Sequence, residues 1–496
     1  MKKSVIKVMC LGLLALTFGC KDDYLDKQPQ GDFITESQLG EAAELNPELI
    51  NGTLQGVYAT MFSTRTGGST GHDDFGHKAY DVFSDMISSD MALSVSTYGW
   101  YRASITELQA MEDFTFFDNR QTWQHYFTMV RASNTVIATL GGSDAEPETD
   151  VNRHILGQAL AMRAHSYFYL TQYFSNDYDS SAPILPLYQA ATNDGAPKAT
   201  TAEVYDLMEA DLNRAIELLG NYNRPSKTEV SKEVAQGILA YVIASTRDVS
   251  RMGEVVALTD AVIANSGATP MSAAEITGGF NNVATPGWIW GVDLTADIGL
   301  GLVSWWGQID AFSYSYAWAG DAKAIDQNLY DAIPADDARK AQFFAGTGYY
   351  NLMPLDKFYD DDRVIGGASQ TVTADYVYMR IAEMHLLKAE ALAKMGQDGP
   401  ARTALANLLA LRLPDTSYLN SLSGAALQDE IHLQTRIELW GEGKSYLALK
   451  RNQGSVTRGT NHLSFQGETF MHNEERMTFE IPEQEILFNP FINDQN

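Results

Sequence analysis

The chain has 496 residues, of which 45% are hydrophobic and 11% aromatic, and it carries a formal net charge of −28. This length suits about two or three domains or one large body built from repeats, and the apolar content is enough for a large core. Such an acidic surface repels nucleic acid and anionic lipid headgroups, so we expect no nucleic-acid partner and no membrane contact through the protein surface itself.

The first residues have the layout of a secretory signal peptide. Residues 1–19 begin with a positively charged stretch, continue with an apolar run over residues 8–18 and end at Gly19. The apolar run is too short to cross a bilayer as a helix. Cys20 follows directly, and a small residue before a Cys is what lipoprotein processing requires. We therefore expect cleavage before Cys20 and a lipid on the new N-terminus; an ordinary signal peptide with a nearby Cys is the alternative.

The cysteine count agrees with an exported lipoprotein. The chain has two Cys, of which Cys10 would be discarded with the signal and Cys20 would be acylated. The mature chain would then contain neither a free thiol nor a disulfide, which excludes thiol catalysis and thiolate metal sites. Residues 20–35 are polar, and we expect them to form a lipidated N-terminus and a tether. One residue departs from the pattern, since Thr17 stands where lipoprotein signals usually have Leu.

The spacing of apolar residues from about 36 to 265 is mostly that of α-helices, and it returns over about 371–496. It predicts helices over residues 118–140, 150–174, 201–219, 229–245, 253–264, 375–396, 398–411 and 426–451. The connections between them are short, and small residues such as Gly157 and Ala389 crowd the helix faces. The pattern indicates stacked helix–turn–helix repeats of the tetratricopeptide kind, although no sequence repeat of roughly 34 residues is visible.

Residues 266–370 have a different composition. Gly and aromatic residues dominate this stretch, helical periodicity is poor, and five of the eight Trp of the chain lie within it. We expect a loop-rich, aromatic-rich insert on the helical scaffold. Functional groups often lie on loops that rigid elements hold in place, so the insert is a candidate location for a binding site.

Several sequence blocks carry a family resemblance. They are residues 159–170 (ALAMRAHSYFYL), 380–391 (RIAEMHLLKAEA), 435–451 (TRIELWGEGKSYLALKR) and 481–490 (IPEQEILFNP). Together they resemble the SusD/RagB family of outer-membrane lipoproteins of Bacteroidetes, and the resemblance covers the whole mature chain in the expected order. Two positions depart from the family pattern, because Lys444 stands where Arg is usual and Ala448 where Asp is usual. The blocks have apolar stripes at helical spacing, so we expect them to be scaffold and not binding site.

The resemblance implies a mainly α fold, a tetratricopeptide-like right-handed helical superhelix formed by residues 36–496. It implies a non-catalytic protein without a cofactor, lipid-anchored at the outer membrane and facing the cell exterior. It also implies a partner, a SusC-like TonB-dependent transporter, to which a captured oligosaccharide is delivered for import. Some members of the family capture peptides, so a peptide ligand is an open alternative.

Flat aromatic rings stack on the apolar faces of pyranose rings, while neighbouring polar groups bind hydroxyls. Two stretches offer such groups, and in relatives an aromatic residue in a loop similar to the first one contacts glycan. The candidate ligand-binding residues are Tyr98, Trp100, Tyr101 and Arg102 in the first stretch, and Trp305, Trp306, Tyr314, Tyr316 and Trp318 in the second. The alternative is that these rings fill a small core of the insert.

Other chemistry has weaker signals. His72-Asp73-Asp74 and residues 360–362 could bind a structural calcium through oxygen ligands, but neither has the spacing of a calcium loop, so we predict solvated acidic turns and no metal. No zinc-protease, nucleophile-elbow or phosphate-loop motif occurs. An acidic helical glycoside hydrolase would need two carboxylates across a cleft, which the sequence does not pair, and it remains an alternative together with a purely structural lipoprotein.

Overall fold

The computed structural model describes residues 48–496 except 193, 362 and 368. The predicted signal peptide over residues 1–19, the lipidation site Cys20 and the tether over residues 20–35 lie outside the described residues. In the part of the chain that is described, no helix is long and apolar enough to cross a membrane.

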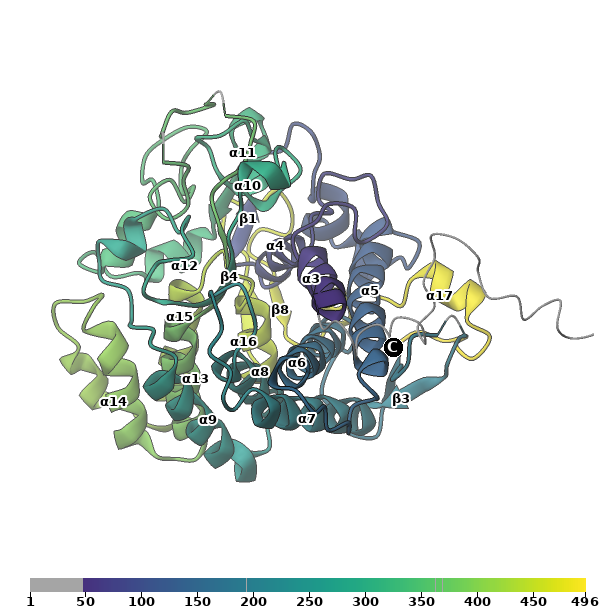
Figure 1. Ribbon diagram of the computed structural model, residues 1–496. Helices are drawn as coiled ribbons and strands as arrows, with labels where there is room; N and C mark the ends of the chain where they lie inside the picture. Colours follow the sequence, from purple (N-terminus) through teal and green to yellow (C-terminus); the bar gives the residue numbers. More distant parts are fainter. Residues whose placement is uncertain (1–47, 193, 362, 368) are drawn as a thin grey trace, which may run out of the picture.

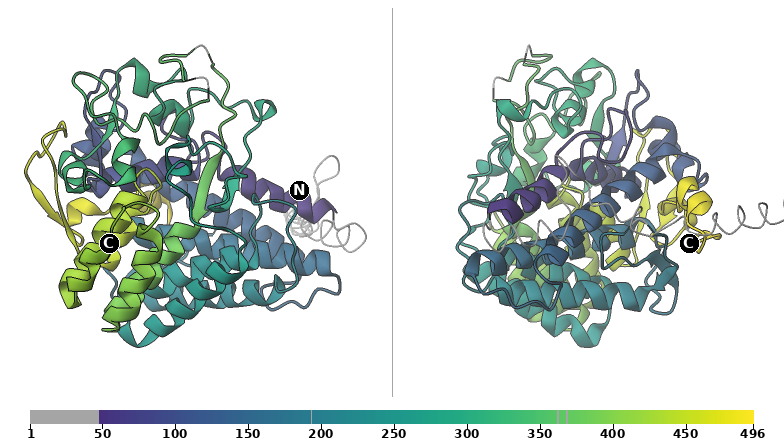
Figure 2. Two further views of the ribbon diagram at one scale, coloured as in Figure 1. Left: turned by 90° about the vertical axis from the view of Figure 1, so that its left-hand side faces the viewer. Right: turned by 45° about the vertical axis from the view of Figure 1, so that its right-hand side comes forward.

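Helices are the main regular elements of the molecule, and long loops join several of them (Figures 1 and 2). The longer helices are α3 (Glu48–Thr60), α4 (His77–Ile87), α5 (Phe117–Thr139), α6 (Asp150–Tyr173), α7 (Thr201–Leu218), α8 (Lys232–Ser245), α9 (Met252–Asn265), α13 (Ile381–Lys394), α14 (Asp398–Leu409), α15 (Gly424–Glu438) and α16 (Ser445–Arg451). From α5 to α9 each helix packs against the next, and α9 then packs against α13. This is the predicted mainly α, tetratricopeptide-like architecture.

Local sequence explains where several of these helices begin. Thr200 and Glu203 form a capping box at the start of α7, in which the side chain of each residue accepts a hydrogen bond from the backbone N–H of the other. Thr149 accepts a hydrogen bond from Asn152 N at the start of α6. The small residue Gly157 of α6 allows close helix packing, because a Cβ atom at this position would come within 2.9 Å of Leu219, which follows α7. Close approach of α6 and α7 therefore requires a small residue at this position.

Two helix predictions are wrong in part. Residues 376–380, expected within the helix over 375–396, form strand β6 (Tyr376–Arg380), because they pair with β4 (Trp288–Val292). The helix expected over 426–451 is two helices, α15 and α16, separated by a turn in which Gly441 and Gly443 have φ of 78° and 71°. Such positive φ values interrupt a helix and are accessible to glycine at little cost.

The remaining strands pair two by two, and all pairs in the described residues are antiparallel. They are β1 (Met91–Leu93) with β5 (Lys323–Ile325), β2 (Pro183–Pro186) with β3 (Lys198–Thr200), β4 with β6, and β7 (Ser455–Thr457) with β8 (Thr469–Met471). Short helices α10 (Trp305–Ile309), α11 (Tyr316–Ala319) and α12 (Gln327–Ala332) interrupt the long loops of residues 266–370, and α17 (Glu483–Phe488) lies near the C-terminus. In Figure 1, α10, α11 and β1 lie together above the long helices.

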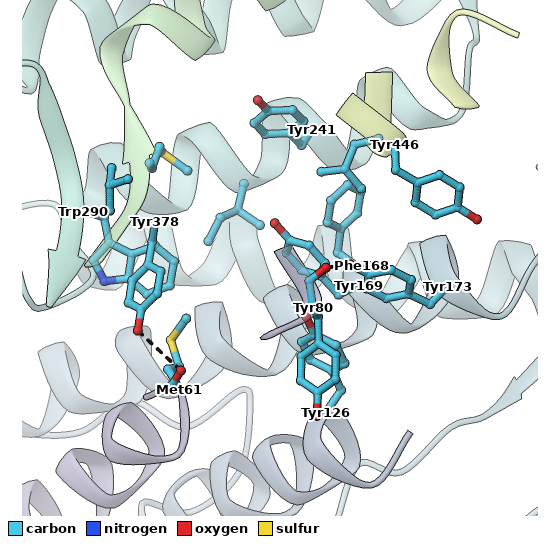
Figure 3. Packing of buried hydrophobic residues seen from close by; sticks show 14 of the residues in the cluster. Met61, Tyr80, Tyr126, Phe168, Tyr169, Tyr173, Tyr241, Trp290, Tyr378 and Tyr446 are labelled. Atoms are coloured by element: carbon cyan, nitrogen blue, oxygen red, sulfur yellow. Dashed lines mark hydrogen bonds between the residues drawn. The ribbon is translucent and has the colours of Figure 1, made fainter. Parts of the chain in front are cut away.

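A row of stacked tyrosines runs through the core (Figure 3). Tyr126 of α5 stacks on Tyr169 of α6 with ring centroids 5.5 Å apart, Tyr169 on Tyr173 at 6.2 Å, and Tyr173 on Tyr446 of α16 at 5.9 Å. All four rings are almost completely buried. Residues from two of the family-like blocks therefore meet in the core, which supports their interpretation as scaffold.

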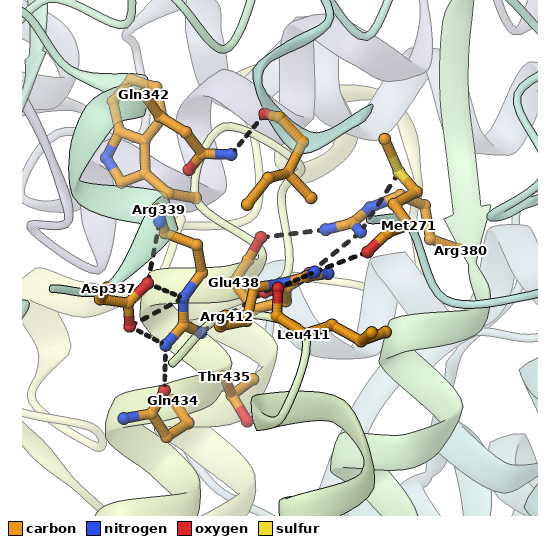
Figure 4. Close-up of polar contacts among 12 residues, drawn as sticks. Met271, Asp337, Arg339, Gln342, Arg380, Leu411, Arg412, Gln434, Thr435 and Glu438 are labelled. Atoms are coloured by element: carbon orange, nitrogen blue, oxygen red, sulfur yellow. Dashed lines mark hydrogen bonds and ion pairs between the residues drawn. The ribbon is translucent and has the colours of Figure 1, made fainter. Parts of the chain in front are cut away.

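A buried network of charges joins two other parts of the scaffold (Figure 4). Glu438 of α15 accepts hydrogen bonds from Arg412 at 2.9 and 2.8 Å and from Arg380 at 3.2 Å, and Arg339 lies 3.4 Å away. Burial by itself would raise the pKa of Glu438, but Arg412 and the other guanidinium groups hold it well below its usual range. Arg380 also binds Glu442 at 2.6 Å. Each of these buried charges has a partner of opposite charge inside the protein, so the network is part of the scaffold.

Candidate functional site

Strand pairing brings the two predicted aromatic stretches together. β1 and β5 are antiparallel, with Leu93 opposite Lys323, so the loop that leaves β1 and the segment that enters β5 lie at the same end of the pair. Beyond the strands, Ser94 N donates to Ala322 O at 2.9 Å and continues the pairing. The loop carrying residues 98–102 therefore lies beside the segment carrying residues 314–318, although the two are far apart in the sequence.

The rings of the two stretches make direct contacts. Tyr98 and Trp100 both pack edge-on against Tyr316, with ring centroids 5.2 and 5.7 Å away and interplanar angles of 71° and 62°. Tyr314 and Trp318 face each other at 6.2 Å in the second stretch. We call the five residues Tyr98, Trp100, Tyr314, Tyr316 and Trp318 the aromatic cluster. An aromatic ring can stack on a sugar where one of its own faces is exposed.

Exposure separates the outer rings of the cluster from its base. Tyr98 is 57% exposed, Tyr314 44% and Trp318 37%, and Trp100 is half-buried. Tyr316, which contacts both Tyr98 and Trp100, is only 9% exposed. A contiguous exposed apolar patch is a more specific sign of an interaction site than single exposed rings are.

Three of the predicted aromatic residues lie in the core. Tyr101, Trp305 and Trp306 are each 2% exposed, so no ring face is open to a glycan. Trp305 packs edge-on against Trp306 with centroids 5.0 Å apart, and Lys323 Nζ lies 5.0 Å from the centre of the Tyr101 ring. For these three residues the structure contradicts a platform role, because Trp305 and Trp306 are buried in α10 and the Tyr101 ring packs edge-on against Phe83 of α4. Trp305 and Trp306 begin α10, which contacts α4.

Arg102 lies at the edge of the first stretch. Its side chain is exposed and its Nε lies 3.1 Å from Glu107 Oε1. An exposed ion pair of this kind contributes little to stability. The guanidinium therefore stays accessible beside Trp100 as a donor for hydroxyl groups.

His72 is a member of the site that sequence reasoning missed. Its ring stacks on Trp100 with centroids 5.3 Å apart and planes inclined by 4°, and its Nδ1 lies 2.7 Å from the Tyr316 hydroxyl. Gln308 Nε2 donates to the His72 carbonyl oxygen at 2.8 Å. Burial, with Arg65 nearby, lowers the pKa of His72. No spacing signal links His72 to Trp100, since the contact arises only from the fold.

The candidate calcium turns have other partners. Asp74 Oδ1 and Oδ2 accept hydrogen bonds from the backbone N–H groups of Gly67 and Ser69, each at 3.0 Å. Asp361 accepts from the Asn281 amide at 2.8 Å, and Asp362 lies outside the described residues. Within the described ranges, no group of three or more His, Cys, Asp or Glu side chains could hold a metal ion.

Large hollows also occur away from the cluster. One, of about 560 Å³, lies between α5, the residues near Tyr188 and the C-terminal α17; another, of about 650 Å³, lies near Glu474 and Glu480. The aromatic cluster is thus an open surface and these cavities are separate from it. An open face suits a long or branched chain molecule better than a small ligand that needs enclosure.

The structure is that of a helical-repeat protein with exposed aromatic residues on the loops beside β1 and β5. A family model described as "Starch-binding associating with outer membrane" matches residues 23–243, and the model of the SusD family matches residues 280–490. The chain belongs to the SusD family. No curated protein sequence matches it.

Solved structures of the same family have the same fold. A SusD-like carbohydrate binding protein from Bacteroides vulgatus is 25% identical, with a TM-score of 0.74 over 93% of this chain and 98% of the other. A SusD superfamily protein from the same species is 18% identical, with a TM-score of 0.75 over 94% and 99%. Surface glycan-binding protein A from Bacteroides thetaiotaomicron, solved in complex with laminarihexaose, is 16% identical, with a TM-score of 0.67 over 90% and 99%.

Proposed function

We propose that this protein is a cell-surface lipoprotein that binds oligosaccharides at the aromatic cluster and delivers them to a SusC-like TonB-dependent transporter for import. The observation that carries the proposal is the contact of Tyr98 and Trp100 with Tyr316, which brings these two rings beside the segment that also carries the exposed Tyr314 and Trp318. Membership of the SusD family and the laminarihexaose held by one relative support a carbohydrate ligand. Arg102 and His72 supply polar groups at the edge of the cluster.

The protein acts without catalysis in this proposal. Glycoside hydrolysis needs two carboxyl groups about 5–10 Å apart across the scissile bond. Asp321, a buried carboxylate beside the cluster, accepts hydrogen bonds from three backbone N–H groups. Incubation with glycan mixtures is expected to release no new reducing ends, and sustained release would overturn this part of the proposal.

Binding is tested on the soluble form lacking residues 1–20. A thermal-shift panel of oligosaccharides that includes laminarihexaose is expected to show a rise in Tm with at least one of them, since a ligand that binds only the folded state stabilises it. Calorimetry then compares the wild type with Trp100→Ala and Trp318→Ala, for which we expect affinity to fall by about 5- to 150-fold, given about 1–3 kcal/mol per stacked ring.

A matched control uses an exposed aromatic residue on a different face. Phe488 of α17 is 79% exposed and lines the hollow beside α5. Phe488→Ala is expected to leave affinity unchanged. If Phe488→Ala abolishes binding and the cluster variants do not, the ligand sits in that hollow and the proposed site is wrong. A rise in Tm with a peptide from a second, peptide panel, and with no oligosaccharide, would change the ligand class.

Anchoring and delivery are tested in cells. Cys20→Ser removes the residue that we expect to carry the lipid, which lies outside the described residues. The variant is expected to leave the membrane fraction and to impair import, while the glycan affinity of the purified protein stays the same. A variant that remains membrane-bound would contradict lipidation at Cys20. Co-purification of the wild type with a TonB-dependent transporter tests the partner.

A further inference from the structure

A buried carboxylate holds the loop that carries two residues of the aromatic cluster. Asp321 is 0% exposed. Its Oδ1 accepts hydrogen bonds from the backbone N–H of Thr97 at 2.7 Å and of Tyr98 at 2.9 Å, and its Oδ2 accepts from the N–H of Trp100 at 3.2 Å. Three backbone N–H groups of one loop therefore donate to a single side chain.

The same residue is fixed to the other half of the cluster. Its own backbone N–H donates to the carbonyl oxygen of Tyr316 at 2.8 Å, directly after α11. Gly320 lies against the Thr97 side chain so closely that any added Cβ would overlap it. Asp321 therefore connects the loop of Tyr98 and Trp100 to the segment of Tyr316 through one residue.

These hydrogen bonds define where the rings point. Bonds from N–H groups to a carboxylate are about twice as strong as neutral ones, and exclusion of water keeps the solvent from replacing them. The backbone from 97 to 100 has no strand or helix of its own. Without the carboxylate, its N–H groups would need other partners and the loop would sample other conformations.

We propose that Asp321 is a positioning residue for glycan capture, which pre-organises Tyr98 and Trp100 against Tyr316 without touching the sugar. The proposal rests on the proposed function of the aromatic cluster. A loop that is already ordered before binding does not lose conformational entropy when the ligand arrives. Removal of the carboxylate should therefore weaken binding even though every aromatic side chain is still present.

The test compares two buried Asp→Asn variants that differ in location. Asp321→Asn puts an amide N–H₂ group opposite backbone donors and so loses acceptors without changing size. Asp375 is the matched control: it is 6% exposed, and its carboxylate accepts from the backbone N–H groups of Val283 and Leu294, each at 2.7 Å. Both changes replace a buried carboxylate that accepts hydrogen bonds from backbone amides, but only Asp321 binds the loop of the aromatic cluster.

Two readouts are taken for each variant. Hydrogen–deuterium exchange in the peptide covering residues 94–102 is expected to become at least 10-fold faster in Asp321→Asn and to stay unchanged in Asp375→Asn. The Kd for laminarihexaose, and for the panel oligosaccharide with the largest Tm shift, is expected to rise at least 10-fold in Asp321→Asn and less than 2-fold in Asp375→Asn. A purely structural role would lower Tm without this local and selective pattern.

The failures are distinguishable. If exchange in residues 94–102 is unchanged, or if it accelerates while Kd stays the same, Asp321 is not a positioning residue, whereas Trp100→Ala still reports on the site. If the wild type binds no oligosaccharide of the panel, both proposals are overturned. Should Asp321→Asn fail to fold, Asp321→Ser replaces it, because it leaves space instead of a misplaced donor, and the same two readouts decide.

Discussion

The hydroxyl of Tyr316 lies 2.7 Å from Nδ1 of His72, a residue 244 positions earlier in the chain. The His72 ring stacks in turn on Trp100, whose edge packs against Tyr316. Three segments distant in sequence thus meet around one phenol ring. Tyr316 is the centre of the aromatic cluster although it is its least exposed member.

Tyr316→Phe removes this hydrogen bond and keeps the ring. We expect a loss of about 1 kcal/mol in the free energy of unfolding, because His72 loses a partner while the apolar contacts remain. Glycan affinity should fall only a few-fold, through looser placement of His72 and Trp100. Thermal melts and calorimetry measure both effects. Tyr314→Phe is the control for stability, since Tyr314 is 44% exposed and its hydroxyl is open to solvent; equal Tm changes in the two variants would contradict the prediction.

Exposure predicts opposite effects for two tryptophans of the insert. Trp318→Ala, at 37% exposed, should leave Tm within about 2 °C of the wild type while weakening glycan binding. Trp306→Ala, at 2% exposed, should lower the free energy of unfolding by about 3–5 kcal/mol, because it leaves a cavity. Chemical unfolding and calorimetry on the same samples separate the two. A stable Trp306→Ala that fails to bind glycan would return Trp306 to the site.

Glu438 is expected to be a strong determinant of stability. Glu438→Gln keeps the size of the side chain but leaves Arg412, whose guanidinium also binds Met271 O at 2.6 Å, without its anion in the protein interior. Breaking a buried pair in this way costs about 3–5 kcal/mol. Glu254→Gln is the control, because its pair with Arg251 is 54% exposed on the Glu side and should cost less than about 1 kcal/mol. Similar losses in urea unfolding for both variants would show that the network contributes little.

Stability should depend on pH through Asp118. Burial raises the pKa of its carboxyl to about 6, above the ordinary value of 3.8, so the folded protein holds a proton that the unfolded chain releases between these values. The contribution of Asp118 to the free energy of unfolding is fully present below pH 3.8 and is lost as the pH rises through about 6. Asp118→Asn cannot titrate, so its stability relative to the wild type should increase between pH 4 and pH 7.5, on the order of 2 kcal/mol. Melts at intermediate pH values measure this, and a difference independent of pH would contradict it.

The departures from the family pattern have a local explanation in the structure. Lys444 Nζ donates to the Tyr169 hydroxyl at 3.1 Å, beside the stacked tyrosines of the core. Burial lowers its pKa, but Tyr169, Glu383 and Asp81 together raise it well above its usual value. Ala448 is 0% exposed and simply fills space in α16. Both positions lie in the scaffold, away from the aromatic cluster.

The sequence predicted the helix positions with small errors, because apolar spacing and capping residues are local features that lie within a few helical turns of each other. The range expected for residues 118–140 became α5 (Phe117–Thr139), and that for 150–174 became α6 (Asp150–Tyr173). The errors at 376–380 and 439–444 have non-local or backbone causes: pairing of β6 with β4, and glycines with positive φ. A strand partner that lies far along the chain leaves no local signal.

By itself, the sequence determined the mainly α fold, the family and the two stretches that hold aromatic residues, since these depend on composition and short-range pattern. Only the tertiary structure decided which of those rings are exposed. Trp305 and Trp318 have the same chemistry, yet one is 2% exposed and the other 37%. Tertiary packing also brought His72 to the cluster, and the pairing of β1 with β5 placed Asp321 beside the loop of Tyr98. Burial is a property of the whole fold, and no spacing along the chain encodes it.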